Sequence, residues 1–393
     1  MALQALCGAR IFTGEHFLDG HAVLLDGARV LDVRPVADVP AGCPRQNLPG
    51  GLLAPGFIDA QVNGGGGVLF NETRTGRGVA AIAAAHARHG TTGLLPTFIT
   101  DHGDRRAEAV AAVRGAVAAR APGILGIHLE GPFLARARKG AHDPGLIRPM
   151  TDGDVDALLG TGLPTVLLTV AAEAVSPQQV RRLSEGGVIV SLGHSDAPYE
   201  AAAAAADAGA RGVTHLFNAM SQLGHRAPGL AGAALDHGGL WAGLIADGHH
   251  VHPAALRVAL RAKQGPARLF LVSDAMPPAG GSGDTFTLGG RTVTRRDGRL
   301  TLPDGTLAGS DLTMDRAVRF AVEHLQQPLA EALRMASLYP AQFLRRDTDR
   351  GRITPGFAAD MVLLSDGLSA RAAWIAGVVT PGSEHPPLAA QAP

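Results

Sequence analysis

The sequence predicts an α/β fold, namely a (β/α)8 TIM-type barrel with a small discontinuous β-sandwich domain formed by both chain ends. Three observations support this prediction. From about residue 56 onward, apolar runs alternate with Ala- and Arg-rich helical stretches, which is typical of a parallel sheet with crossover helices. Eight such runs can be counted, the number that closes a TIM-type barrel. Both chain ends instead show short β-type runs.

The chain has 393 residues, more than one compact core normally supports, so two structural units are expected. Residues 1–54 contain short apolar runs separated by Gly, Asp and Pro without a 3.6-residue period, and they predict the N-terminal part of a small β domain. Residues 55–345 are expected to form the barrel. Residues 346–393 begin with short β-type runs again and should complete the small domain.

The predicted barrel strands follow one another along the chain. They cover residues 57–62, 93–98, 124–129, 165–170, 188–192, 212–217, 240–246 and 269–273. Helices are expected between many of them, at 78–89, 104–119, 177–186, 198–209 and 253–262. After the eighth strand, two Asp-Gly turns between short β runs predict a hairpin within 283–308, and helices near 312–324 and 329–338 should close the barrel.

Charge and cysteine content exclude several classes of protein. Lys+Arg and Asp+Glu both number 35, so no overall field attracts nucleic acid or an anionic membrane surface. No apolar run approaches the ~20 residues that a membrane helix needs. Only two cysteines occur, Cys7 and Cys43, and the chain starts without a basic-then-apolar leader. We therefore expect a cytoplasmic protein without a disulfide framework.

Polar residues gather where the predicted strands end, which is where the active site of a (β/α)8 barrel lies. Glu130 ends the third strand, His194 follows the fifth, and His215 lies near the end of the sixth. A catalytic zinc-type site uses about three His and carboxylate ligands and leaves one position for water. These residues are therefore candidate ligands of one divalent ion per subunit, with zinc the first expectation and iron, cobalt or manganese also compatible.

Two further strand-end residues are candidates for the chemical step. Asp274 follows the eighth strand and is placed to take a proton from an attacking water and hand it to a leaving amine. His250 follows the seventh strand and can donate a hydrogen bond to a carbonyl oxygen as negative charge develops on it. His249 and His252 lie close by, so chemistry alone does not choose among the three histidines.

Ordered sequence blocks then identify a family. The chain contains PGFIDAQVNGGGG, GIHLEGPFL, KGAHDP, LGHSDA, THLFNAM, HRAPGLAGAAL, ADGHHVHP, LVSDAMPPAG and LAGSDLTMDRAV. From about residue 50 to 340 these blocks resemble the N-acetylglucosamine-6-phosphate deacetylases of the amidohydrolase superfamily. The resemblance implies hydrolysis of the acetamide of a phosphorylated amino sugar by a homodimeric, metal-dependent enzyme.

The resemblance also implies a role for each candidate residue. Glu130, His194 and His215 would bind the metal, Asp274 would be the catalytic acid and base, and His250 would polarise the acetamido carbonyl. The implied substrate contacts are Gln61, Asn63, His142, the backbone of Asn218 and Ala219, Arg226, His250 and Leu307. Arg226 would reach the sugar phosphate from the partner subunit, a role that suits a guanidinium because it can grip a phosphate through two hydrogen bonds.

One departure from the wider superfamily concerns the number of ions. Many amidohydrolases end the first strand with His-x-His, which holds a second metal, whereas this chain has Gln61 and Asn63 there. Amide side chains are poor ligands for zinc-like ions, so a single ion is expected. The fourth predicted strand also lacks a lysine that could bridge two metals. It remains open that both amides bind nothing and only cap the strand.

Two rival functions stay open at this point. The first is another mononuclear amidohydrolase, for example a D-aminoacylase-like enzyme, and Arg226 with His142 argues against it because a neutral substrate would not use them. The second is a catalytically silent protein that binds sugar phosphates. The sequence also leaves open whether N-acetylgalactosamine 6-phosphate is accepted.

Overall fold

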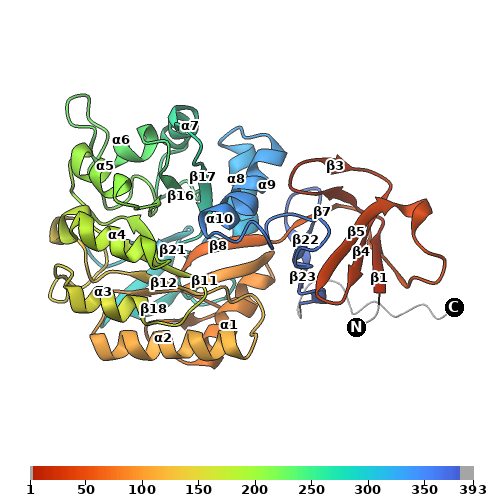
Figure 1. The fold of residues 1–393 in the computed structure, drawn as a ribbon, viewed down its shortest axis with the longest axis horizontal. Helices are drawn as coiled ribbons and strands as arrows, with labels where there is room; N and C mark the ends of the chain where they lie inside the picture. The colour runs from red at the N-terminus through yellow and green to blue at the C-terminus, as the bar shows by residue number, and fades with distance from the viewer. Residues whose placement is uncertain (1–2, 381–393) are drawn as a thin grey trace.

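An eight-stranded parallel barrel forms the larger part of the computed structural model, which describes residues 3–380 (Figure 1). Its strands pair in chain order and are β8 (Phe57–Val62), β11 (Thr91–Ile99), β12 (Ile127–Glu130), β13 (Val166–Val170), β14 (Ile189–Leu192), β15 (Gly212–Val213), β16 (Trp241–Ile245) and β17 (Leu269–Val272). Just beyond β17, Asp274 donates its backbone N–H to the carbonyl of Gln61 at 3.0 Å, and Asn63 donates to Ala275 at 2.9 Å. These bonds join the last strand to the first and confirm the predicted fold class.

Five helices between the strands lie within about two residues of their predicted positions: α1 (Gly76–Ala87), α2 (Gly103–Ala118), α4 (Pro177–Glu185), α5 (Tyr199–Asp207) and α7 (Pro253–Ala262). Two more were not predicted. The helix α3 (Asp152–Leu159) is short and acidic, and α6 (Gly229–Asp236) is built from Gly, Ala and Leu with almost every residue buried. A helix without a polar face lacks the 3.6-residue alternation that reveals an amphipathic helix.

The sixth barrel strand is much shorter than predicted. Residues 212–217 were expected to be extended, but β15 contains only Gly212 and Val213. The backbone leaves the strand because His215 and Phe217 adopt positive φ angles of 34° and 73°. This turn brings His215 over the mouth of the barrel.

Two small sheets lie beside the barrel, and one of them combines both ends of the chain, where Figure 1 shows red N-terminal strands next to blue C-terminal ones. One sheet orders β5 (Arg29–Pro35), β4 (His21–Asp26), β1 (Leu3–Cys7) and β6 (Arg45–Asn47). The other orders β24 (Val378–Val379), β23 (Ala370–Ile375), β22 (Met361–Leu364), β7 (Leu52–Pro55), β2 (Arg10–Phe12) and β3 (Phe17–Leu18). Leu6, Leu25, Leu53, Met361 and Trp374 share their buried core. The boundaries at 54 and 345 stay predictions, and residues 381–393 lie outside the described part.

The predicted hairpin after the eighth strand is a four-stranded antiparallel sheet of β18 (Thr285–Leu288), β19 (Arg291–Arg296), β20 (Arg299–Thr301) and β21 (Leu307–Ser310). Leu288, Val293 and Leu300 give it a buried core of its own, which also includes Met276. Ser310 donates its backbone N–H to the carbonyl of Asp274 at 2.9 Å, so β21 is fixed to the rim of the barrel. A shorter hairpin, β9 (Gly64–Gly65) with β10 (Val68–Leu69), follows β8.

The final helices are α8 (Met314–Glu323), α9 (Leu329–Ala336) and α10 (Leu338–Phe343). The first two match the predicted closing helices. Among residues 3–380, no helix is both long enough and apolar enough to span a membrane.

Candidate active site

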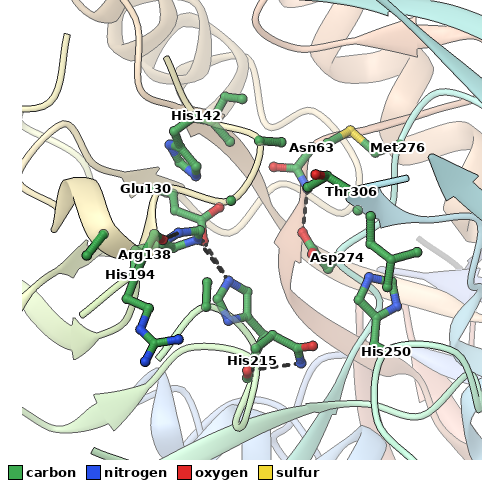
Figure 2. A pocket seen from close by; sticks show the side chains of 18 residues that line it. Asn63, Glu130, Arg138, His142, His194, His215, His250, Asp274, Met276 and Thr306 are labelled. Carbon is green, nitrogen blue, oxygen red and sulfur yellow. Dashed lines mark hydrogen bonds and ion pairs between the residues drawn. The ribbon is translucent and has the colours of Figure 1, made fainter. Parts of the chain in front are cut away.

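A cavity of about 360 Å³ lies at the C-terminal ends of the barrel strands (Figure 2). Most of the residues singled out in the sequence line it: Asn63, Glu130, His142, His194, His215, Asn218, Ala219, His250, Asp274 and Leu307. Gln61 is not among the lining residues, and its side chain instead contacts Glu130. Arg226 lies on an exposed loop and does not line the cavity of its own chain.

Three buried side chains converge on one point of this cavity. Glu130 is the last residue of β12, while His194 and His215 each lie two residues beyond β14 and β15. The Nε2 atoms of both histidines lie 3.2 Å from Glu130 Oε1 and 3.1 Å from each other. One ligand atom from each residue falls within 4.8 Å of the others. The predicted ligand set is therefore assembled in space.

The hydrogen bond of His194 to the main chain indicates that the set fits a divalent cation. His194 Nδ1 lies 2.8 Å from the carbonyl oxygen of Arg138, which only accepts hydrogen bonds. His194 Nδ1 therefore carries a hydrogen, and in the neutral ring Nε2 keeps its lone pair. The Glu130 carboxylate oxygen and the Nε2 atoms of both histidines thus lie within 3.2 Å of one another. Such a His2Glu set is what a catalytic zinc-type site uses.

Left-handed backbone turns aim the side chains at the cavity. His194, His215 and Asp274 have φ angles of 48°, 34° and 52°, a region that non-glycine residues rarely adopt. Each of these residues lies two positions beyond the end of a barrel strand, and each left-handed conformation costs about 1–2 kcal/mol. Conformations of this kind gather at functional sites because the surrounding structure must hold them in place.

The two carboxylates of the cavity differ in their protonation. Burial opposes the charge of Glu130, but the imidazole rings of His194 and His215 beside it outweigh burial and hold its pKa well below the ordinary value. Burial raises the pKa of Asp274 to about 6, and the negative charge of Glu130 adds to this rise. Glu130 is therefore a permanent anion, whereas Asp274 changes protonation near neutral pH.

The structure distinguishes the three histidines that follow β16. Only His250 lines the cavity. Its Nδ1 lies 2.6 Å from Asp247 Oδ2, so Nε2 is the ring nitrogen left for a ligand. His252 accepts a hydrogen bond from the backbone N–H of Ala254 at the start of α7, and His249 accepts one from Arg299. The contact between Asp247 and His250 was not predicted from the sequence, although the two residues stand three positions apart in the ADGHH block.

His142 lies on the other side of the cavity, with its ring centroid 4.4 Å from that of His194. Its Nδ1 is 2.7 Å from Thr100 Oγ1. Burial lowers the pKa of His142 to about 3, so the ring is neutral at physiological pH. His142 therefore offers hydrogen bonds to a ligand but no positive charge.

Arg138 is a lining residue that the sequence had not singled out. It belongs to the loop after β12, and its Nη2 lies 2.7 Å from Asp196 Oδ1. Among the residues that line the cavity in the described chain, Arg138 is the only Arg or Lys. Arg138 could have been predicted as a lining residue from the sequence, because it lies in the basic run RARK just after the third strand.

Comparison with known proteins agrees with this geometry. Residues 52–383 match the amidohydrolase family, and residues 3–53 match the NagA composite domain. A relative named N-acetylgalactosamine-6-phosphate deacetylase from Shewanella sp. (strain ANA-3) is 41% identical over 372 residues, which cover 94% of this chain and 94% of the relative. A Homo sapiens relative named N-acetylglucosamine-6-phosphate deacetylase is 38% identical over 404 residues, covering 95% of this chain and 96% of the relative.

A solved structure shows the same likeness in three dimensions. The crystal structure of N-acetylglucosamine-6-phosphate deacetylase from Pasteurella multocida superposes on this chain with a TM-score of 0.93 at 36% sequence identity. The match covers 96% of this chain and 99% of that one. The likeness therefore includes both the barrel and the small sheets.

Proposed function

The chain belongs to the amidohydrolase family, and we propose that it hydrolyses the acetamide of N-acetyl-D-glucosamine 6-phosphate to give D-glucosamine 6-phosphate and acetate. The observation that carries this proposal is the convergence of Glu130, His194 and His215 in the cavity that Asp274 also lines. Relatives that match more than nine-tenths of the chain are named for this reaction or for its galactosamine counterpart.

Glu130, His194 and His215 would hold one divalent ion, for which zinc is our first choice. When bound, such an ion would polarise the acetamide carbonyl and lower the pKa of water toward ~7. Gln61 and Asn63 are amides, and their weakness as zinc ligands supports a count of one ion.

Asp274 would carry the proton. As a carboxylate it accepts a proton from the attacking water, and as an acid it returns that proton to the nitrogen when the carbon–nitrogen bond breaks. A pKa raised to about 6 by burial suits both steps near neutral pH. The products are the amine and acetic acid, whose proton passes to the amine or to solvent, and Asp274 returns to its carboxylate form.

His250 is our proposed donor to the carbonyl oxygen. Because its Nδ1 is engaged by Asp247, the ring donates from Nε2 only when both nitrogens carry hydrogen. The Asp247 carboxylate, at 2.6 Å, compensates the charge of that doubly protonated ring. Asp247 therefore supports the donor role of His250.

The remaining lining residues would recognise the phosphorylated sugar. We assign hydrogen bonds to the sugar phosphate to His142 and to the backbone of Asn218 and Ala219, and apolar contact with the sugar to Leu307. His142 is neutral and Arg138 is already paired with Asp196, so the dianionic phosphate needs another cation. We propose that the partner subunit's Arg226 supplies it in a homodimer. The free thiols of Cys7 and Cys43 support our assignment of the enzyme to the cytoplasm.

The proposal is tested by acetate release from three substrates with zinc-loaded protein. We expect turnover of N-acetyl-D-glucosamine 6-phosphate, much slower turnover of the unphosphorylated sugar, and loss of at least ~100-fold in kcat for Asp274→Asn. N-acetyl-D-galactosamine 6-phosphate belongs in the panel because the Shewanella relative is named for it. Zinc-loaded wild type that is no faster than Asp274→Asn would support the silent sugar-phosphate-binding rival, and equal turnover with and without the phosphate would support another amidohydrolase.

A further inference from the structure

The first barrel strand places a column of polar side chains inside the barrel. Successive side chains of a strand alternate between its faces, so Asp59, Gln61 and Asn63 share the inward face of β8 and its C-terminal end. All three are buried, with exposed fractions of 0%, 2% and 1%. Buried polar groups are expected to have hydrogen-bond partners, and the partners of Gln61 and Asn63 are the two carboxylates of the active site.

Gln61 contacts Glu130 from outside the cavity. Its Nε2 lies 3.2 Å from Oε1 and 3.3 Å from Oε2 of that carboxylate. Glu130 is ionised and can only accept, so the amide nitrogen must be the atom that faces it. Because Gln61 does not line the cavity, its contact acts on the position of Glu130.

Asn63 contacts Asp274 in the same manner. Its Nδ2 donates to Asp274 Oδ1 at 2.7 Å, the dashed bond drawn between the two residues in Figure 2. One carboxylate oxygen is thereby occupied, and Oδ2 is left to exchange a proton with water or amine. The hydrogen bond also stabilises the ionised form of Asp274, because it lowers a pKa that burial raises.

We propose that the two amides of β8 are positioning residues with separate tasks: Gln61 holds Glu130 for metal binding, and Asn63 holds Asp274 for proton transfer. The second task rests on the deacetylase function proposed above, whereas the first requires only that the site binds a metal. Both residues were expected from the family resemblance to contact substrate. In the structure each amide donates to a carboxylate, which explains why the strand keeps polar side chains at positions that are unsuited to binding a second ion.

The side chains of Gln61 and Asn63 can be replaced without loss of the main-chain hydrogen bonds at these two positions. The carbonyl of Gln61 accepts from the N–H of Asp274, and the N–H of Asn63 donates to the carbonyl of Ala275. These main-chain bonds close the barrel and do not involve the amide groups. Gln61→Met and Asn63→Leu nearly keep the volume of each side chain and remove its amide group, including the donor to the carboxylate.

The first arm of the test measures zinc affinity by competition with a chromophoric chelator, without any turnover. Gln61→Met should weaken binding by roughly 10-fold, the scale reported for lost contacts to metal ligands. Asn63→Leu should stay within about 3-fold of wild type, because its partner is not a ligand. Asn71→Leu is the matched control, since it removes a buried amide outside the active-site cavity that bonds to Asp101 and the Ile99 carbonyl.

The second arm measures the pH dependence of kcat/KM at saturating zinc. Asn63→Leu should lower kcat by roughly 10- to 100-fold and move the acid limb to higher pH, because the hydrogen bond that favours ionised Asp274 is lost. Gln61→Met should leave the position of the acid limb unchanged. Asn71→Leu should also leave it unchanged.

The outcomes separate the alternatives. Equal losses of zinc affinity in both variants, or an acid limb that moves equally in both, would overturn the division of tasks. If wild type binds zinc but releases no acetate, the proposed function fails, and the affinity arm still decides the role of Gln61. Near-ultraviolet circular dichroism identifies any variant that does not fold, and Gln61→Ala and Asn63→Ala then take its place with the same expectations.

Discussion

The pairing of Asp247 with His250 shows how a single carboxylate selects one histidine among neighbours of equal chemistry. Asp247 Oδ1 accepts the backbone N–H groups of His249 and His250, at 2.8 and 2.9 Å, while Oδ2 binds the His250 ring. Asp247 therefore fixes both the loop and the ring. The sequence located Glu130, His194 and Asp274 because each follows a recognisable strand. The chemistry of the residues alone did not choose His250, which only the family resemblance singled out, since that choice depends on the turn that Asp247 holds.

Removing the charge of Asp247 should therefore impair catalysis. We expect Asp247→Asn to lower kcat by roughly 10-fold and Asp247→Ala by about 100-fold, because the His250 ring loses the carboxylate that accepts from its Nδ1 and orients it. Steady-state kinetics of acetate release at several substrate concentrations measures both variants. His252→Ala is the control, since the His252 ring accepts a hydrogen bond from Ala254 at the start of α7 and does not line the cavity. A normal kcat for Asp247→Ala would exclude the proposed role of His250.

At the scale of elements, the barrel strands fix where the active-site residues lie, and the turns after the strands set the direction in which their side chains point. The sequence predicts the barrel strands because strands buried on both faces appear as continuous apolar runs. It predicts the length of β15 wrongly because THLF is apolar enough to resemble strand, while the positive φ angles at His215 and Phe217 come from the site geometry. The helix α3 could have been predicted, since Thr151 and Asp154 form a capping box at its start.

We expect Asp154 to contribute more to the stability of α3 than any other residue of this helix. It is 7% exposed, bonds to Thr151, and accepts two hydrogen bonds from Arg148 at 2.7 Å. The Arg148 hydrogen bond holds the pKa of Asp154 well below its usual range. We expect Asp154→Asn to lower Tm by about 2–4 °C at pH 7. Asp156→Asn, on the exposed face of the same helix, should change Tm by less than about 1 °C.

The pH dependence of this effect has a definite sign. Because the folded-state pKa of Asp154 is depressed, its stabilisation is complete above the ordinary carboxyl pKa of ~4 and is lost as pH falls through the depressed value. The Tm difference between wild type and Asp154→Asn should stay constant from pH 8 to 5 and shrink below about pH 4. Calorimetry across this range measures the difference. A gap of equal size at pH 3 and pH 7 would contradict the account.

At the scale of the whole molecule, the two chain ends meet in one unit because β7 lies between N-terminal β2 and C-terminal β22. Short β-type runs at both chain ends, separated by the alternating strand and helix patterns of the barrel, were sufficient to predict this discontinuous arrangement. The four-stranded sheet after β17 was predicted only as a hairpin, because strands such as TVTRR are polar and short. A pairing between subunits has no local sequence pattern, so the homodimer stays a proposal supported by the exposed position of Arg226.

Complementation between two defective chains tests whether subunits share a site. An Arg226→Ala chain keeps Asp274, and an Asp274→Asn chain keeps Arg226, so a mixed dimer should contain one complete site. Equal co-expression should restore roughly a quarter of wild-type activity at low substrate concentration, since half of the dimers are mixed and each has one working site of two. Pairing Glu130→Gln with Asp274→Asn should restore nothing, because both defects lie within one chain's site. Failure of the first pair, or a monomer by light scattering, would refute the partner role of Arg226.

The central claim is that one divalent ion at Glu130, His194 and His215 supports deacetylation. Its most direct test is a titration of chelator-stripped protein with zinc, in which the initial rate of acetate release from N-acetyl-D-glucosamine 6-phosphate is measured after each addition. The account predicts no activity without metal and a linear rise to a plateau at one ion per chain. Activity in fully stripped protein, or a plateau at two ions per chain, would contradict it.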